Sequence, residues 1–126
     1  MVGADIIISN NFWTSPTRLQ GVGLANQWQD YARAAAENAL KARAAGNPGA
    51  YIAGGMAAPN LQRKAGSEES DVVIMGEQAV RQEFAAHAAL LADMGVDALL
   101  PEYVGHIADC VAAAAACEGT DLPVFL

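Results

Sequence analysis

Four short apolar runs alternate with three longer helical segments, and this alternation constrains the fold more than any other feature of the chain. The runs are expected to form strands at residues 6–8, 50–53, 96–100 and 122–126. They are short and bounded by glycine, proline or polar residues, which is typical of strands buried on both faces. Each intervening segment is long enough for a right-handed crossover between parallel strands. The order predicts an α/β fold with a parallel βαβαβαβ arrangement.

The crossover segments have the apolar periodicity of helices. Helices are expected over residues 25–45, 75–94 and 105–118, with a short helical turn after Ser15 and Pro16. Residues 57–71 are expected to form a surface loop.

The core-facing residues of these helices follow from the same periodicity. Trp28 and Tyr31 are expected in the core from the first helix, and Ile107 and Val111 lie on the apolar face of the last. His87 falls on the apolar stripe of the second helix without a cysteine or carboxylate partner at ligand spacing. It is therefore expected to be packed rather than to bind a metal.

The last apolar run, Pro123–Leu126, has no helix after it to cover it. A free-standing flavodoxin-like sheet would normally finish with a helix. An eight-stranded barrel needs about 250 residues, and this chain has 126. We therefore expect about half of a TIM (β/α)8 barrel, with residues 1–126 forming a partial domain.

Three of the expected strands end in chemically distinctive groups, and the carboxyl ends of parallel strands meet at one edge of a sheet. The groups at these strand ends are a carboxylate, a hydroxyl, amides, exposed backbone and aromatic rings. Together they suit a small zwitterionic or cationic ligand. Trp13 or Tyr103 could contact a cationic methyl donor. The candidate binding residues are Ser9, Asn11, Trp13, Gly54, Gly55, Glu102 and Tyr103.

Glu102 is the central residue of this candidate site, because it follows the apolar run 96–100 directly after Pro101. Proline has no backbone N–H and so cannot extend the hydrogen-bonded ladder. A carboxylate just past a parallel strand can serve a binding site. It can equally be a helix N-terminal carboxylate stabilised by the helix dipole. Both interpretations stay open from the sequence.

Charge and cysteine content exclude several classes of protein. A net charge of −7 argues against nucleic-acid binding, and no apolar run approaches the ~20 residues of a membrane helix. No signal peptide is visible, so a cytoplasmic protein with reduced thiols is expected. Cys110 and Cys117 would lie about 10 Å apart on one helix, too far for a disulfide, and are expected to be small buried apolar side chains.

Several segments together resemble the homocysteine S-methyltransferase family. They are Gly3–Phe12, Ser15–Leu19, Ala53–Gly55 and Ala92–Asp97 running into Pro101–Tyr103. The family includes betaine–homocysteine methyltransferase and the homocysteine domain of cobalamin-dependent methionine synthase. The resemblance runs along the whole chain in order and implies the second to fifth strands of the family's (β/α)8 barrel.

The resemblance implies transfer of a methyl group to the sulfur of homocysteine, giving methionine. In the family, zinc held by three cysteine thiolates binds the substrate sulfur. Glu102 matches the acid that holds the homocysteine amino group, and Ser9, Asn11 and Trp13 match the strand end that faces the substrates. In betaine-using members, aromatic residues near the positions of Trp13 and Tyr103 contact the methyl donor.

The chain also departs from the family pattern. Cys110 and Cys117 match no zinc-ligand position, so neither a metal ligand nor a catalytic residue is assigned here. We expect this chain alone to bind no catalytic zinc and to transfer no methyl group, and the methyl donor is undetermined. Two other functions are open: a non-catalytic module that binds an amino acid or a partner chain, and a half-barrel that associates with itself.

Overall fold

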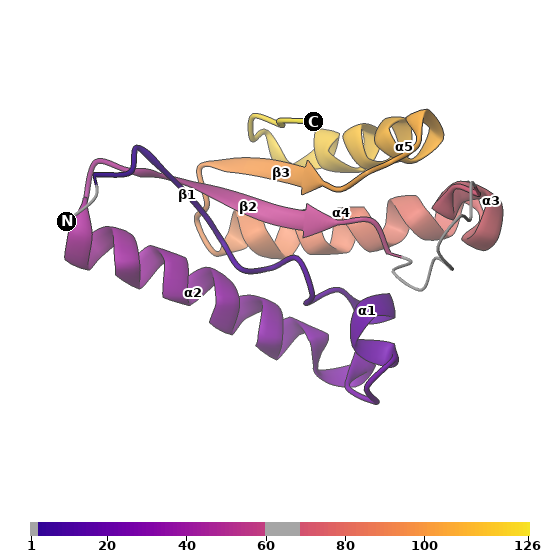
Figure 1. Ribbon diagram of the computed structural model, residues 1–126, viewed down its shortest axis with the longest axis horizontal. Coiled ribbons are helices and arrows are strands. Elements are labelled where there is room, and N and C mark those ends of the chain that lie inside the picture. Colours follow the sequence, from indigo (N-terminus) through magenta and orange to yellow (C-terminus); the bar gives the residue numbers. More distant parts are fainter. Residues whose placement is uncertain (1–2, 60–68) are drawn as a thin grey trace.

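The sheet consists of three parallel strands that neighbour one another in chain order. A computed structural model describes residues 3–59 and 69–126. The strands are β1 (Ile6–Ile8), β2 (Tyr51–Ala57) and β3 (Ala98–Glu102), in the order β1-β2-β3 (Figure 1). The register pairs Ile7 with Ile52 and Ala53 with Ala98. The predicted parallel α/β arrangement is confirmed.

The expected fourth strand is present as a single parallel bridge between Leu99 and Val124. Leu99 N donates to Pro123 O and Phe125 N donates to Leu99 O, each at 2.9 Å. This places the C-terminal segment on the outer edge of β3. Strands therefore continue to add in chain order, as they do in a barrel.

Helices connect the strands and form one core with a single face of the sheet. They are α1 (Pro16–Gln20), η1 (Ala25–Gln27), α2 (Trp28–Gly46), α3 (Asp71–Met75), α4 (Glu77–Asp93), α5 (Ile107–Cys117) and η2 (Glu118–Thr120). The core joins Ala36 of α2, Met56 of β2, Leu91 of α4, Leu99 of β3 and Ala112 of α5. Within the described residues, no helix combines the length and apolar character that a membrane span needs.

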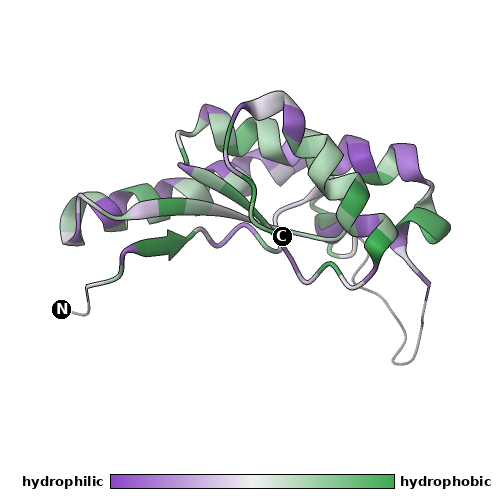
Figure 2. Ribbon diagram, turned by 90° about the horizontal axis from the view of Figure 1, so that it is seen from above, coloured by the Kyte–Doolittle hydropathy of each residue, from purple (hydrophilic) through white to green (hydrophobic). Residues whose placement is uncertain are grey.

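The opposite face of the sheet is open along β1, where the expectation of a strand buried on both faces is wrong, whereas β2 is buried from Ile52 to Ala57. Ile6 and Ile8 are 58% and 53% exposed. They border a shallow concavity of about 650 Å³ that also includes Tyr51, Leu100 and Phe125. Figure 2 shows that β1 is strongly apolar and forms the edge of the sheet that is farther from α5. No described element covers this face.

Several boundaries differ from the sequence expectation. The third strand is Ala98–Glu102 rather than 96–100, so Pro101 and Glu102 lie inside the strand and not after its end. The second strand does not stop at Ala53 but continues through Gly54 and Gly55 to Ala57. The expected helix at 75–94 is divided at Gly76, whose φ of 87° is accessible to glycine and costly for other residues. Of the expected loop at 57–71, residues 60–68 lie outside the described residues.

The buried faces of two helices are rotated from those predicted. In α2 the buried residues are Ala32, Ala36 and Ala39, while Tyr31 is 44% exposed. In α5, Ile107 and Val111 point outward and are 84% and 60% exposed. Alanine faces let these helices approach their neighbours closely, which larger side chains on the same face would prevent. The bulky side chains therefore lie elsewhere.

The buried stripe of α4 follows the prediction. Four residues of this stripe are at most 2% exposed: Val80, Phe84, His87 and Leu91. The helix ends before Gly95, which has a φ of 83°. At the amino ends of the strands, Asp97 Oδ2 accepts from Ile52 N and from Arg43 Nη1, each at 2.7 Å. These bonds fix β2 against β3 at the edge opposite the strand tips.

Candidate functional site

A pocket of about 570 Å³ lies at the carboxyl ends of β1 and β3. It brings together residues from the turn after β1 and from the end of β3, although these are about ninety residues apart in the chain. It is open to solvent on one side. The lining residues are Ile8, Ser9, Asn10, Phe12, Trp13, Glu102 and Tyr103.

The carboxylate of Glu102 lies over the backbone of Gly55. A Cβ added at Gly55 would be 2.7 Å from Glu102 Oε1 and 3.0 Å from the carbonyl oxygen of Ser9. Gly55 N donates to Ser9 Oγ at 3.2 Å, and Ser9 N donates to Ala53 O at 2.9 Å. Glycine at position 55 therefore makes room for the acid between two strand tips.

Glu102 is not a helix N-terminal carboxylate. The next helix, α5, begins at Ile107 after the cap residue His106, and the acid in its first turn is Asp109. Burial raises the pKa of Glu102 above its ordinary value, and the nearby Arg18 guanidinium partly offsets this rise. The interpretation of Glu102 as a helix-capping acid is therefore wrong. Glu102 is a partly buried acid beside an open pocket.

Three aromatic rings, Phe12, Trp13 and Tyr103, form what we call the aromatic wall. Phe12 meets Trp13 edge-on at 5.8 Å between ring centroids and Tyr103 at 5.2 Å. Trp13 is 58% exposed and Tyr103 is 82% exposed. Edge-on packing of this kind is favourable. The wall leaves large ring surfaces beside Glu102 for a ligand.

Arg18 supports this wall from behind, although the sequence analysis gave it no role in the site. Its guanidinium carbon lies 4.4 Å from the Phe12 ring centroid and 5.1 Å from that of Trp13. Nε and Nη2 both donate to Ala58 O, at 3.1 and 2.7 Å. Burial lowers the pKa of Arg18 to about 10, against the raising influence of Asp71, Glu83 and Glu102. An arginine five residues after an aromatic pair was the available signal.

Two of the predicted site residues do not face the pocket. The side chain of Asn11 is fully buried, and its Nδ2 donates to Ala32 O at 2.8 Å and to Thr14 Oγ1 at 3.2 Å. A Cβ at Gly54 would meet Leu91 and Val96 on the helix side of the sheet. The structure brings together five of the seven predicted residues: Ser9, Trp13, Gly55, Glu102 and Tyr103. The other two, Asn11 and Gly54, face the protein interior.

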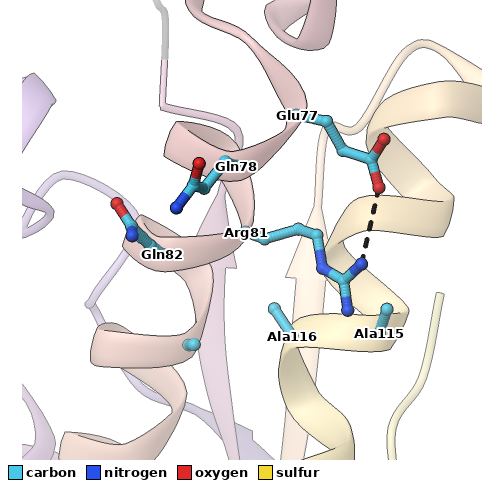
Figure 3. Close-up of a pocket in the computed structure, with 7 residues that line it drawn as sticks. Glu77, Gln78, Arg81, Gln82, Ala115 and Ala116 are labelled. Carbon is cyan, nitrogen blue, oxygen red and sulfur yellow. Dashed lines mark hydrogen bonds and ion pairs between the residues drawn. The ribbon is translucent and has the colours of Figure 1, made fainter.

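A second concavity of about 560 Å³ lies between α4 and α5 (Figure 3). Its polar side chains are Gln78, Gln82 and the exposed ion pair of Arg81 with Glu77, 3.5 Å apart. None of the strand-tip residues borders it. The described residues that line this groove include no arrangement of nucleophile, acid and base.

The chain's cysteines do not fit a zinc site of three thiolates. Only two are present in the sequence. Cys117 is 1% exposed, and burial raises the pKa of its thiol to about 11, which favours the form that does not bind metal. Cys110 donates from Sγ to Val104 O at 3.6 Å. In residues 3–59 and 69–126, no three His, Cys, Asp or Glu side chains are grouped to hold a metal ion.

The fold and pocket define a class of protein. Parallel strands in chain order, helices on one face and a pocket at the carboxyl ends of the strands are the features of (β/α)8-barrel proteins. A model of the family described as Homocysteine S-methyltransferase matches residues 1–126, the full length of the chain. The chain belongs to the homocysteine S-methyltransferase family, as the sequence resemblance implied. No curated protein matches it.

Proposed function

We propose that the pocket at the strand tips binds homocysteine and that the protein serves methyl transfer to the homocysteine sulfur. The observation that carries the proposal is the carboxylate of Glu102, which lies over Gly55 at the border of the pocket in a chain of this family. The homocysteine ammonium would pair with this carboxylate. Such charge-assisted hydrogen bonds are about twice as strong as neutral ones.

The aromatic wall would receive the apolar part of the ligands. Sulfur and methyl groups make favourable contacts with aromatic rings, and Trp13 and Tyr103 expose such rings beside Glu102. The methyl donor itself stays unassigned. We place the protein in the cytoplasm, because it carries free thiols at Cys110 and Cys117.

Zinc would ionise the homocysteine sulfur in the chemistry that the family resemblance implies. Cys110 and Cys117 do not suit that role, since one is buried and protonated and the other donates to a backbone carbonyl. The residues of this chain would bind and orient the amino acid. We propose that the chain alone does not catalyse the transfer.

Calorimetric titration of homocysteine under reducing conditions tests the proposal. Glu102→Gln keeps the shape of the side chain and removes its charge, and we expect it to weaken binding about 10-fold or more. Glu118→Gln is the matched control, because Glu118 is exposed and lies in η2, past the far end of α5. Equal affinities of the wild type and Glu102→Gln would contradict the proposal.

Self-association is a second candidate function, favoured by the open face of the sheet. Ile6, Ile8 and Phe125 are more than half exposed along the concavity of about 650 Å³. An exposed apolar face beside unpaired strand edges favours pairing with another chain. Light scattering should then report a dimer or larger species, whereas a monomer at high concentration would contradict this candidate.

A further inference from the structure

We propose that Thr14 is a positioning residue of the pocket: with Asn11 and His87, it fixes the turn that carries Phe12 and Trp13 beside Glu102. The proposal deepens the proposed function and rests on it, because the pocket is taken as the binding site. None of the three residues lines the pocket. They act through the aromatic wall.

Thr14 is the centre of a buried polar cluster. Thr14 Oγ1 lies 2.9 Å from Asn11 O, 3.2 Å from Asn11 Nδ2 and 3.3 Å from His87 Nε2. The exposed fractions are 8% for Thr14, 0% for Asn11 and 2% for His87. Asn11 Oδ1 is buried without a hydrogen-bond partner among the described residues, whereas Asn11 Nδ2 and Thr14 Oγ1 are bonded. Buried hydrogen bonds of this kind hold a local geometry, because a displacement would leave further buried groups without a partner.

The cluster joins three separate elements at one point. Asn11 Nδ2 reaches Ala32 O on α2 at 2.8 Å, and His87 projects from α4. The Trp28 and His87 rings pack in a T-shaped arrangement with 6.1 Å between their centroids. The turn after β1 is therefore held against two helices.

This anchoring determines where the aromatic rings lie. The start of the turn is fixed at Ser9, which bonds to Ala53 O and to Gly55 N, and its end is fixed at Thr14. Phe12 and Trp13 lie between these two anchors. Their side chains line the pocket, whereas those of Asn11 and Thr14 are buried beneath it. A shift of the Thr14 anchor would move both rings relative to Glu102.

The protonation state of His87 agrees with this arrangement. Burial, followed by the charge of Arg18, lowers the pKa of His87 to about 4, so the ring is neutral at physiological pH. A neutral imidazole has one N–H and one acceptor nitrogen. Because the Thr14 hydroxyl already donates its one proton to Asn11 O, it can accept a hydrogen bond from His87 when the ring carries its proton on Nε2.

Thr14→Val tests the proposal, because valine keeps the shape of threonine and removes the hydroxyl. The indole N–H resonance of Trp13, assigned with Trp13→Phe, reports the ring's surroundings, and calorimetry reports homocysteine affinity. We expect Thr14→Val to shift the Trp13 resonance and to weaken homocysteine binding about fivefold or more. Thr14→Ser restores the hydroxyl and should return both values toward those of the wild type.

Thr120→Val is the matched control for lost stability. Thr120 Oγ1 in η2 donates to Cys117 O at 2.8 Å and accepts from Leu122 N at 3.5 Å, so the substitution removes the hydrogen bonds of a threonine hydroxyl outside the pocket. It should lower the melting temperature and leave both the Trp13 resonance and the homocysteine affinity unchanged. If Thr14→Val behaves like Thr120→Val, Thr14 is only structural and the proposal is overturned.

A second variant, His87→Leu, tests the proposal if Thr14→Val does not fold. It removes the contact between His87 and Thr14, together with the packing of the imidazole on Trp28, and an unmoved Trp13 resonance would overturn the proposal. Should the wild type bind no homocysteine, the proposed function fails. The Trp13 resonance in the free protein then still decides whether Thr14 positions the ring.

Discussion

The carboxylate of Glu102 lies back over Gly55, although the register of the strands pairs Glu102 with Ala57 and Gly55 with Leu100. The side chain therefore leans two residues along β2, toward the tip of β1. This diagonal reach brings the acid beside Ser9, and it is possible only because position 55 has no side chain. The geometry of the candidate site depends on this pair.

Replacement of Gly55 by alanine should displace Glu102. The new Cβ would meet Glu102 Oε1 at 2.7 Å and the Ser9 carbonyl oxygen at 3.0 Å. We expect about 1–3 kcal/mol of destabilisation from overpacking, together with a loss of homocysteine affinity. Gly54→Ala is the matched control: its Cβ meets Leu91 and Val96, so it should lower stability and leave affinity unchanged. Unaltered homocysteine binding by Gly55→Ala would be incompatible with this site.

Replacement of Arg18 by methionine should raise the pKa of Glu102. The Arg18 charge lowers the pKa of that carboxyl, against the effect of burial. Carbon-13 NMR of the Glu102 carboxyl as a function of pH measures the change. Arg18→Lys keeps the positive charge and should change the pKa less. An identical Glu102 titration in wild type and Arg18→Met would show that the two groups are not coupled.

Stability should fall as the pH is lowered from 7 to 5, because of His87. Its folded-state pKa of about 4 lies below the ordinary value of 6.5, so the unfolded chain binds the proton more readily. The stabilisation is present above pH 6.5 and is lost toward pH 4, with roughly 2 kcal/mol lost between pH 7 and pH 5. Urea unfolding at both pH values measures the loss. His87→Gln should remove most of the dependence; if the variant keeps it in full, another group is responsible.

The two cysteines should react at different rates with a thiol reagent at pH 8. Cys117 is buried with a pKa of about 11, so its thiolate is scarce and inaccessible, whereas Cys110 is partly exposed. We expect one fast thiol in the native protein and two in urea, and Cys110→Ser should remove the fast one. Protection of both thiols by added zinc would contradict our conclusion that these cysteines do not suit the metal.

The order of strands and helices could be predicted from the sequence because it depends on short-range patterns. The apolar run 6–8, the glycine stop at Gly95 and the buried stripe through His87 each follow from local periodicity. Strand tips meet at one edge in any parallel sheet, so the convergence of Ser9, Trp13 and Glu102 was also predictable.

Side-chain direction within the turn and on alanine-rich helices could not be predicted in the same way. Asn11 and Trp13 are two residues apart in an irregular segment, where no period tells which side chain faces inward. In α5, alanine and isoleucine satisfy the same apolar pattern, and close packing selected the smaller side chains for the core. Arg18 was missed because its partners, Ala58 O and the two rings, are brought to it only by the tertiary fold.

The most direct test of the account is a thermodynamic cycle between Glu102 and the ammonium group of the ligand. Homocysteine and 4-mercaptobutyrate, which lacks the amino group, would each be titrated into the wild type and Glu102→Gln. We predict that the substitution lowers the affinity for homocysteine about 10-fold or more, whereas the affinity for 4-mercaptobutyrate changes by less than about twofold. Equal effects of the substitution on both ligands would show that Glu102 does not hold the amino group, and would contradict the account.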